Sequence, residues 1–166
     1  MMRNRTSLNG LVLFTVLAGM LLFTACEPVE DPPLEVLVGE PMVLDIEEAT
    51  IENANYRKVE WTGAYMQLVF MSLQPGEIID LEVHDDHDQF IRIEAGNARI
   101  QMGKTPDQLT FDRTLSDDWA ALIPAGYWHK VINEGDTELK LYTLYAPPEH
   151  PEGLVQAAYP GEGGDR

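Results

Sequence analysis

The sequence predicts an all-β fold, built as a sandwich or a barrel, and three observations support this. Residues 34–146 show no long helical periodicity. They contain short runs that are apolar or alternate between apolar and polar residues, as strands do, and turn residues separate these runs. The chain also has 11 Pro and 13 Gly among 166 residues, which favours many turns over a helical bundle.

Each predicted strand is one of these runs, and each ends where turn residues begin. In chain order the predicted strands are 35–38, 42–46, 57–61, 66–74, 78–84, 89–95, 97–102, 109–114, 119–123, 128–133 and 138–146. The separating residues are Gly39, Pro75-Gly76, Gly96-Asn97, Thr105-Pro106-Asp107, Pro124-Ala125-Gly126 and Asn133-Glu134-Gly135-Asp136. Residues 45–56 are expected to form a short helix or an irregular lead-in. Residues 35–153 are predicted to form one domain, and residues 154–166 a disordered tail.

Composition excludes two classes of protein. The chain carries 11 Lys and Arg against 28 Asp and Glu, a net charge of −17, so no basic surplus is available to neutralise phosphates. We therefore expect no nucleic-acid partner. The single cysteine, Cys26, excludes a disulfide framework.

The N-terminal segment has the features of a secretory signal. Arg3 and Arg5 precede an apolar run over 11–23, which is short for a membrane span, and small residues follow it. Cys26 comes directly after Thr24-Ala25, which resembles the lipobox of bacterial lipoproteins, where the cysteine is lipidated. An ordinary cleaved signal and an uncleaved anchor are the alternatives. We expect a lipoprotein signal peptide over 1–25.

This assignment predicts where the protein resides in the cell. A Pro-rich acidic tether over 26–34 would follow the lipidated Cys26. The lipid would attach the protein to a membrane of the cell envelope, on the periplasmic or outer-membrane side. The predicted domain would therefore lie outside the cytoplasm.

Two segments contain the residues with the most distinctive chemistry. In the first, residues 76–96, Glu82 and His84 are two positions apart on a predicted strand, so both side chains project from one face. In the second, residues 118–133, the turn Pro124-Ala125-Gly126 precedes His129 at the start of a strand. A carboxylate and an imidazole on one face are suited to binding one metal ion.

These segments resemble the two motifs of the cupin superfamily. The first motif is Gly, five residues, His-x-His, four residues, Glu, six residues, Gly, and the second is Gly, five residues, Pro-x-Gly, two residues, His, three residues, Asn. The residues of this chain at the first set of positions are Gly76, Glu82, His84, Gln89 and Gly96. Those at the second set are Asp118, Pro124, Gly126, His129 and Asn133.

The resemblance implies a fold and an assembly. The wider stretch 56–153 is similar to a group of small single-domain cupins. It implies a double-stranded β-helix, or jelly-roll, barrel with a single cupin domain. It also implies a homodimer, since cupins often pair through their sheets.

The resemblance further implies one divalent transition metal, with Fe, Mn and Zn as the candidates. Carried over by position, its ligands would be Glu82, His84, Gln89 and His129. This chain departs from the motif at Glu82, where the family has His, at Gln89, where it has Glu, and at Asp118, where it has Gly. Gln89 is also what a cupin that has lost its metal would show. His87 lies off the motif in an acidic turn and is an accessory ligand at most.

Two classes of function follow from this site. One is a metal-dependent enzyme that oxygenates or isomerises a small molecule, in which Glu82 or His87 could accept a proton if it is not a ligand. The other is a non-catalytic lipoprotein that binds or senses a small ligand. The sequence assigns no catalytic residue. Arg92 and Arg99 are predicted either to pair with a carboxylate or to receive an anionic group of the substrate.

Overall fold

The computed structural model describes residues 39–161 and 163, which lie in one structural unit, residues 35–166. The elements are α1 (Ile46–Glu52), β1 (Arg57–Thr62), β2 (Gln67–Leu73), β3 (Ile78–Glu82), β4 (Asp88–Ala95), β5 (Asn97–Gly103), β6 (Phe111–Ser116), β7 (Ala120–Ile123), β8 (Trp128–Asn133), β9 (Leu139–Ala146) and β10 (Val155–Gln156). The signal peptide, Cys26, the tether and the strand expected at 35–38 lie outside the described residues. Among the described residues, no helix has the length and apolar character needed to cross a membrane.

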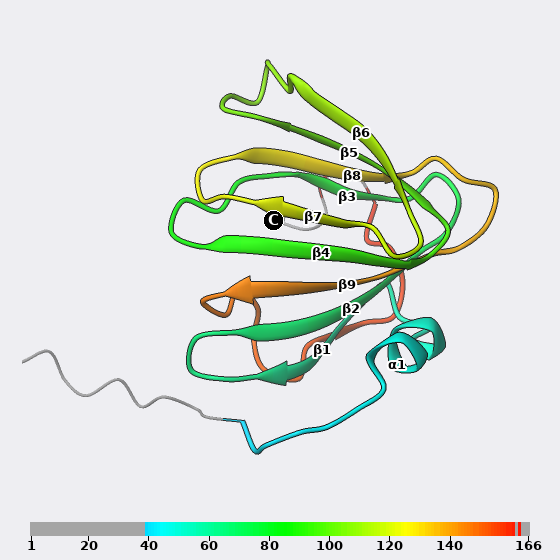
Figure 1. The fold of residues 1–166 in the computed structure, drawn as a ribbon, viewed down its shortest axis with the longest axis vertical. Coiled ribbons are helices and arrows are strands. Elements are labelled where there is room, and N and C mark those ends of the chain that lie inside the picture. The colour runs from blue at the N-terminus through cyan, green and yellow to red at the C-terminus, as the bar shows by residue number, and fades with distance from the viewer. Residues whose placement is uncertain (1–38, 162, 164–166) are drawn as a thin grey trace, which may run out of the picture. The chain divides into compact units, whose positions relative to one another are not determined.

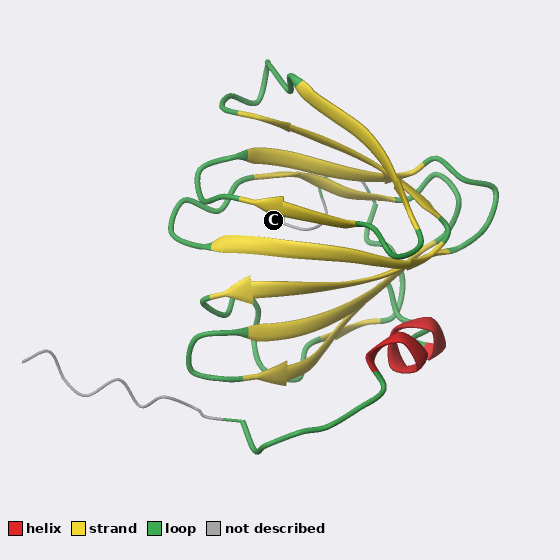
Figure 2. Ribbon diagram, in the orientation of Figure 1, coloured by secondary structure: helices red, strands yellow, loops and turns green. Residues whose placement is uncertain are grey.

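The strands form two antiparallel sheets that face each other, which confirms the predicted all-β jelly-roll class (Figures 1 and 2). One sheet has six strands in the order β10-β1-β2-β9-β4-β7, and we call it sheet A. The other, sheet B, has four strands in the order β3-β8-β5-β6. Strands β6 and β7 are therefore both edge strands, one from each sheet.

The hydrophobic core lies between the inner faces of the two sheets. Direct register partners on antiparallel strands share a face, so the inner residues follow from the pairing. Sheet A contributes Val69, Met71, Leu73, Ile91, Ile93, Ala121, Ile123, Leu139 and Leu141. Sheet B contributes Ile79, Ala98, Ile100, Leu115 and Val131. At one end of this core the inner residues become polar, and the candidate site lies there.

The strand predicted over 42–46 is wrong, and of the two alternatives given for 45–56 the structure has the short helix. The carboxylate of Asp45 accepts a hydrogen bond from the backbone N–H of Glu48 at 3.1 Å, which caps α1 and sets its start. Leu44, Ile46 and Ala49 pack with the outer face of sheet A. Burying these apolar side chains against an existing sheet favours the helix over an added strand.

The prediction of a disordered tail over 154–166 is wrong for its first part. Strand β10 pairs with β1, and the N–H of Val59 donates to the carbonyl of Leu154 at 2.9 Å. Leu154 and Tyr159 pack against the core, and the ring of Tyr159 lies 5.3 Å from that of Tyr56. These contacts with a distant strand fix the segment.

Four of the motif positions have a left-handed backbone, namely Gly76, Gly96, Asp118 and Gly126. Gly76 and Gly96 both have φ of +85°, and Asp118, where the family has Gly, has φ of 68°. Aspartate tolerates this region better than most residues do, which explains why the turn survives the substitution. Gly96 is more constrained than Gly76, because a Cβ on Gly96 would lie 2.8 Å from the carbonyl oxygen of Glu138.

This difference predicts the effects of two matched substitutions. We expect Gly96→Ala to lower the free energy of unfolding by about 2–4 kcal/mol, from the unfavourable φ and the backbone clash together. Gly76→Ala has the same φ and nothing within 4 Å of the new Cβ, so we expect a loss of only about 1 kcal/mol. Urea denaturation of both variants measures this. Equal losses would contradict the role of the close approach.

Candidate metal centre

The two motif turns are held together by hydrogen bonds between their backbones and side chains. The N–H of Gly126 donates to the carbonyl of His84 at 2.7 Å. The N–H of Ala125 donates to the carboxylate of Asp88 at 2.9 Å. These bonds connect the turn before β8 to the segment between β3 and β4, so residues from two distant parts of the chain meet at one end of the core.

Three of the predicted ligands come together at this end. Glu82 ends β3, His129 lies opposite it on β8, and His84 follows just beyond β3. One carboxylate oxygen of Glu82 lies 3.1 Å from Nε2 of His129 and 3.4 Å from Nε2 of His84. One donor atom from each of the three residues lies within 4.8 Å of the other two.

The spacing of these donor atoms suits a bound ion. Ligands about 2.1 Å from a metal are about 3.0 Å apart along the edge of an octahedron and about 3.4 Å apart along the edge of a tetrahedron. The two distances from Glu82, 3.1 and 3.4 Å, fall in this range. The three residues are therefore grouped closely enough to hold one cation together.

The orientation of His129 is fixed by its second nitrogen. Nδ1 lies 3.0 Å from the carbonyl oxygen of Tyr127, which can only accept a hydrogen bond. Nδ1 therefore carries a proton, and Nε2, which faces Glu82, is the nitrogen that is left to bind a cation. The ring is fully buried, with 0% exposed, so its position is also held by packing.

Gln89, the fourth predicted ligand, lies on the inner face of sheet A in the same polar layer. Its register partner on β9 is Tyr145, whose ring is 5.5 Å from that of His84. The amide nitrogen of Gln89 donates to Thr143 Oγ1 at 3.0 Å. Its amide oxygen is buried and has no hydrogen-bond partner among the described residues. A buried oxygen without a partner is costly, and a cation bound beside it would satisfy it.

Glu82 and His84 each change the pKa of the other. Burial of Glu82 opposes its ionisation, but hydrogen bonds from His129 and His84, together with their charges, outweigh burial and lower the pKa of Glu82 to about 2. Burial likewise opposes protonation of His84, but Glu82 and Glu149 outweigh it and raise the pKa of His84 above 6.5. The carboxylate is thus ionised and ready to bind a cation at neutral pH.

These shifts predict how metal affinity depends on pH. A proton on His84 competes with the metal. Because the pKa of His84 is raised above 6.5, metal affinity should already decrease at a pH higher than 6.5 when the solution is acidified. The expected loss is about tenfold per pH unit for each proton displaced. Glu82, with a pKa of about 2, stays ionised throughout. Competition with a chelator between about pH 8 and 5.5 measures this, and a flat profile would contradict it.

His87 is buried rather than exposed on its acidic turn. It is only 6% exposed, and its ring stacks on that of His84 at 4.4 Å. Its Nδ1 lies 2.8 Å from a carboxylate oxygen of Asp86, and its Nε2 lies 3.4 Å from one of Glu149. His84, His87 and Glu149 form a second group that could hold a metal, and it shares His84 with the first.

Glu149 and His150, which follow β9, lie beside the site although no motif includes them. Gln67 holds this segment, because its amide donates to the carbonyl of His150 at 2.8 Å and accepts from the N–H of His150 at 2.9 Å. Glu149 is thereby placed beside His84, and the ring of His150 lies 5.1 Å from that of Tyr145. Burial raises the pKa of Tyr145, so its phenol stays protonated at neutral pH. The prolines at 147, 148 and 151, which restrict the backbone, are the sequence feature that indicated a defined conformation for this segment.

The two strand arginines pair with carboxylates, as one of the two interpretations predicts. Arg92 contacts Glu94 at 3.3 Å and also Asp118. Arg99 lies 2.6 Å from Asp112 and 2.8 Å from Glu134. Neither guanidinium points to the group of Glu82, His84 and His129.

Comparison with known proteins agrees with the fold and the motifs. Residues 69–145 match the family model described as a cupin domain. The chain is 51% identical over 116 residues to Uncharacterized protein YrkC of Bacillus subtilis (strain 168), which covers 70% of this chain but only 62% of that relative. It is 44% identical over 123 residues to Uncharacterized protein L612 of Acanthamoeba polyphaga mimivirus, covering 74% of this chain and 75% of that one.

A solved structure shows the same relationship in three dimensions. The crystal structure of BH2720 from Bacillus halodurans superimposes with a TM-score of 0.70 at 48% sequence identity. The match covers 71% of this chain and 89% of that one. The family match over residues 69–145 contains Glu82, His84, Gln89 and His129.

Proposed function

Because the chain belongs to the cupin family, we propose that it binds one divalent transition metal through Glu82, His84, Gln89 and His129 and acts on a small molecule there. The observation that carries this proposal is the spacing of the three donor atoms around Glu82, 3.1 and 3.4 Å, in a buried site. Two imidazoles with one carboxylate suit Fe, Mn or Zn. The unpartnered amide oxygen of Gln89 supplies a fourth donor without charge.

The side chains around the donor group indicate what each would do. A bound metal supplies Lewis acidity and open coordination positions. Glu82 balances one positive charge, and His129 is held by Tyr127 so that it cannot turn away. His87 and Glu149 lie next to His84, and we propose that they move a proton to or from a bound molecule. Oxygenation and isomerisation are the two reactions we propose.

The test is a metal inventory of protein purified without chelator under anaerobic conditions. We expect close to one metal per chain in the wild type and almost none in the His84→Ala/His129→Ala double variant. Equal metal content in the two proteins would overturn the proposal. With the metal known, oxygen consumption on a panel of small molecules separates an oxygenase from an isomerase.

A second candidate function is binding or sensing of a small ligand without turnover. Gln89 favours it, because a neutral amide replaces the carboxylate that the family motif has at this position. A ligand that binds the metal-loaded protein tightly and is recovered unchanged would support this alternative. Turnover of any bound ligand would exclude it.

We further propose that the protein is lipid-anchored in the cell envelope through Cys26 and outside the cytoplasm. The support is the sequence pattern over 1–26. Incorporation of labelled palmitate into the wild type but not into Cys26→Ser, together with membrane fractionation, tests this. Label in both proteins would contradict it.

We also propose a homodimer that forms through the outer face of sheet A. Its support is the exposure of Leu122 and Met66 beside Phe90 and Leu144 on that face. Light scattering of the wild type and of Leu122→Glu tests it. We expect the substitution to shift the mass from two chains to one.

A further inference from the structure

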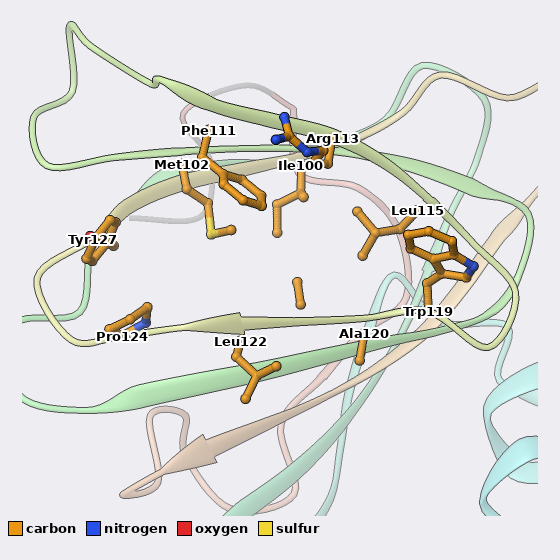
Figure 3. Close-up of a pocket in the computed structure, with 11 residues that line it drawn as sticks. Ile100, Met102, Phe111, Arg113, Leu115, Trp119, Ala120, Leu122, Pro124 and Tyr127 are labelled. Carbon is orange, nitrogen blue, oxygen red and sulfur yellow. The ribbon is translucent and has the colours of Figure 1, made fainter.

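A cavity of about 510 Å³ opens between the two edge strands, β6 of sheet B and β7 of sheet A. Figure 3 shows Met102, Phe111 and Leu115 on one side of this space and β7 on the other. Its eleven lining residues include no aspartate or glutamate, and Arg113 is the one charged residue among them. The volume lies in the range of small-molecule sites.

The walls of the cavity leave apolar surface in contact with water. Trp119 is 60% exposed, because it precedes β7, which is an edge strand of the described sheet. The ring of Phe111 is also exposed on β6. Exposed aromatic side chains that line one concave surface are typical of a ligand site.

Arg113 differs from Arg92 and Arg99, which pair with carboxylates. Its guanidinium lies over the ring of Phe111, with Cζ 4.9 Å from the ring centre, and Nη1 donates to the carbonyl of Asp112 at 2.6 Å. Within residues 39–161 and 163, no carboxylate lies at ion-pair distance from it. The carboxylate of Asp112 is bound by Arg99 instead.

A second cation lies at the rim of the same cavity. Nζ of Lys104 is 3.9 Å from the ring centre of Tyr127, which lines the cavity. The chain as a whole carries a net charge of −17. A cavity whose lining contains one cationic side chain and no carboxylate, in so acidic a protein, is complementary to an anion.

The cavity begins next to the candidate metal centre. Met102, on its wall, is the register partner of His129, so both side chains lie on the inner face of sheet B. Tyr127, also on its wall, accepts the hydrogen bond that orients His129. A molecule in the cavity would therefore lie beside the metal ligands.

We infer that this cavity binds small organic acids that have an apolar or aromatic body and one carboxylate. The body would contact Phe111, Trp119 and Met102, and the carboxylate would pair with Arg113 through its unused N–H groups. Binding of such an acid does not depend on the proposed function. Its role as the substrate does.

The test compares three ligands of one shape and different charge: hexanoate, 1-hexanol and hexylammonium. Each is titrated into the purified full chain with chelator present, and the indole N–H signal of Trp119 is followed by NMR after assignment with Trp119→Phe. We expect hexanoate to bind at least about tenfold more tightly than hexylammonium. Arg113→Gln should weaken hexanoate binding about tenfold and leave hexanol binding unchanged.

Arg99→Gln is the matched control, because it removes the same charge from the neighbouring strand on the opposite face of the sheet. It should change hexanoate affinity less than about twofold. Equal affinities for the three ligands, no binding, or an unchanged affinity in Arg113→Gln would overturn the inference. Because chelator is present, the ligand series does not depend on a bound metal. Absence of metal in the inventory would overturn the proposed function, whereas failure of the ligand series would overturn only this inference.

Discussion

His129→Ala is expected to lower the affinity of the protein for a divalent transition metal by more than about 100-fold. The substitution removes one of the two imidazoles that meet at Glu82. Loss of a residue that only hydrogen-bonds a metal ligand lowers metal affinity by about 10–100-fold, and loss of a direct ligand should lower it further. His87→Ala is the matched control, because His87 belongs only to the second group, with His84 and Glu149. We expect it to lower affinity by less than about tenfold.

Metal content after purification and competition with a chelator measure both effects. Circular dichroism and thermal unfolding establish that each variant is folded. If His87→Ala abolished binding and His129→Ala did not, the metal would belong to the second group. If neither changed the affinity, neither group would hold it.

Gln89→Glu is expected to have opposite effects on the metal-free and the metal-loaded protein. Gln89 is 3% exposed, so a carboxylate at this position would be buried without a cation to balance its charge. We expect the metal-free protein to lose more than about 2 kcal/mol of unfolding free energy. With metal bound, the added carboxylate should raise the affinity at least about tenfold, because it replaces a neutral donor with a charged one.

Urea denaturation with chelator and with saturating metal measures this change. Gln89→Leu is the control, because it removes the amide without adding charge and should weaken metal binding in either case. An equal loss of stability with and without metal would show that position 89 does not face the ion.

The strand pattern could be predicted from the sequence because most runs have sharp turn residues at their ends. The helix α1 and the strand β10 were harder, since both depend on contacts with distant parts of the chain. Leu44 and Ile46 pack on sheet A, and Val155 pairs with Lys58. The residue pattern within each segment does not predict these contacts with distant residues.

The sequence predicted the site residues that occupy motif positions but not the other residues of the site. Glu82, His84 and His129 meet as the spacing implies, and Gln89 lies in the same layer. The burial of His87 depends on stacking against His84, which no spacing records. Glu149 is close only because Gln67 holds the segment after β9, a contact between residues far apart in sequence.

The most direct measurement is a crystal structure of the metal-loaded protein, with anomalous scattering recorded at the absorption edge of the bound metal. A single strong peak within about 2.0–2.3 Å of Glu82, His84 and His129 is expected, with the amide oxygen of Gln89 turned towards it. A peak between His84, His87 and Glu149, or none at this end of the core, would contradict the account.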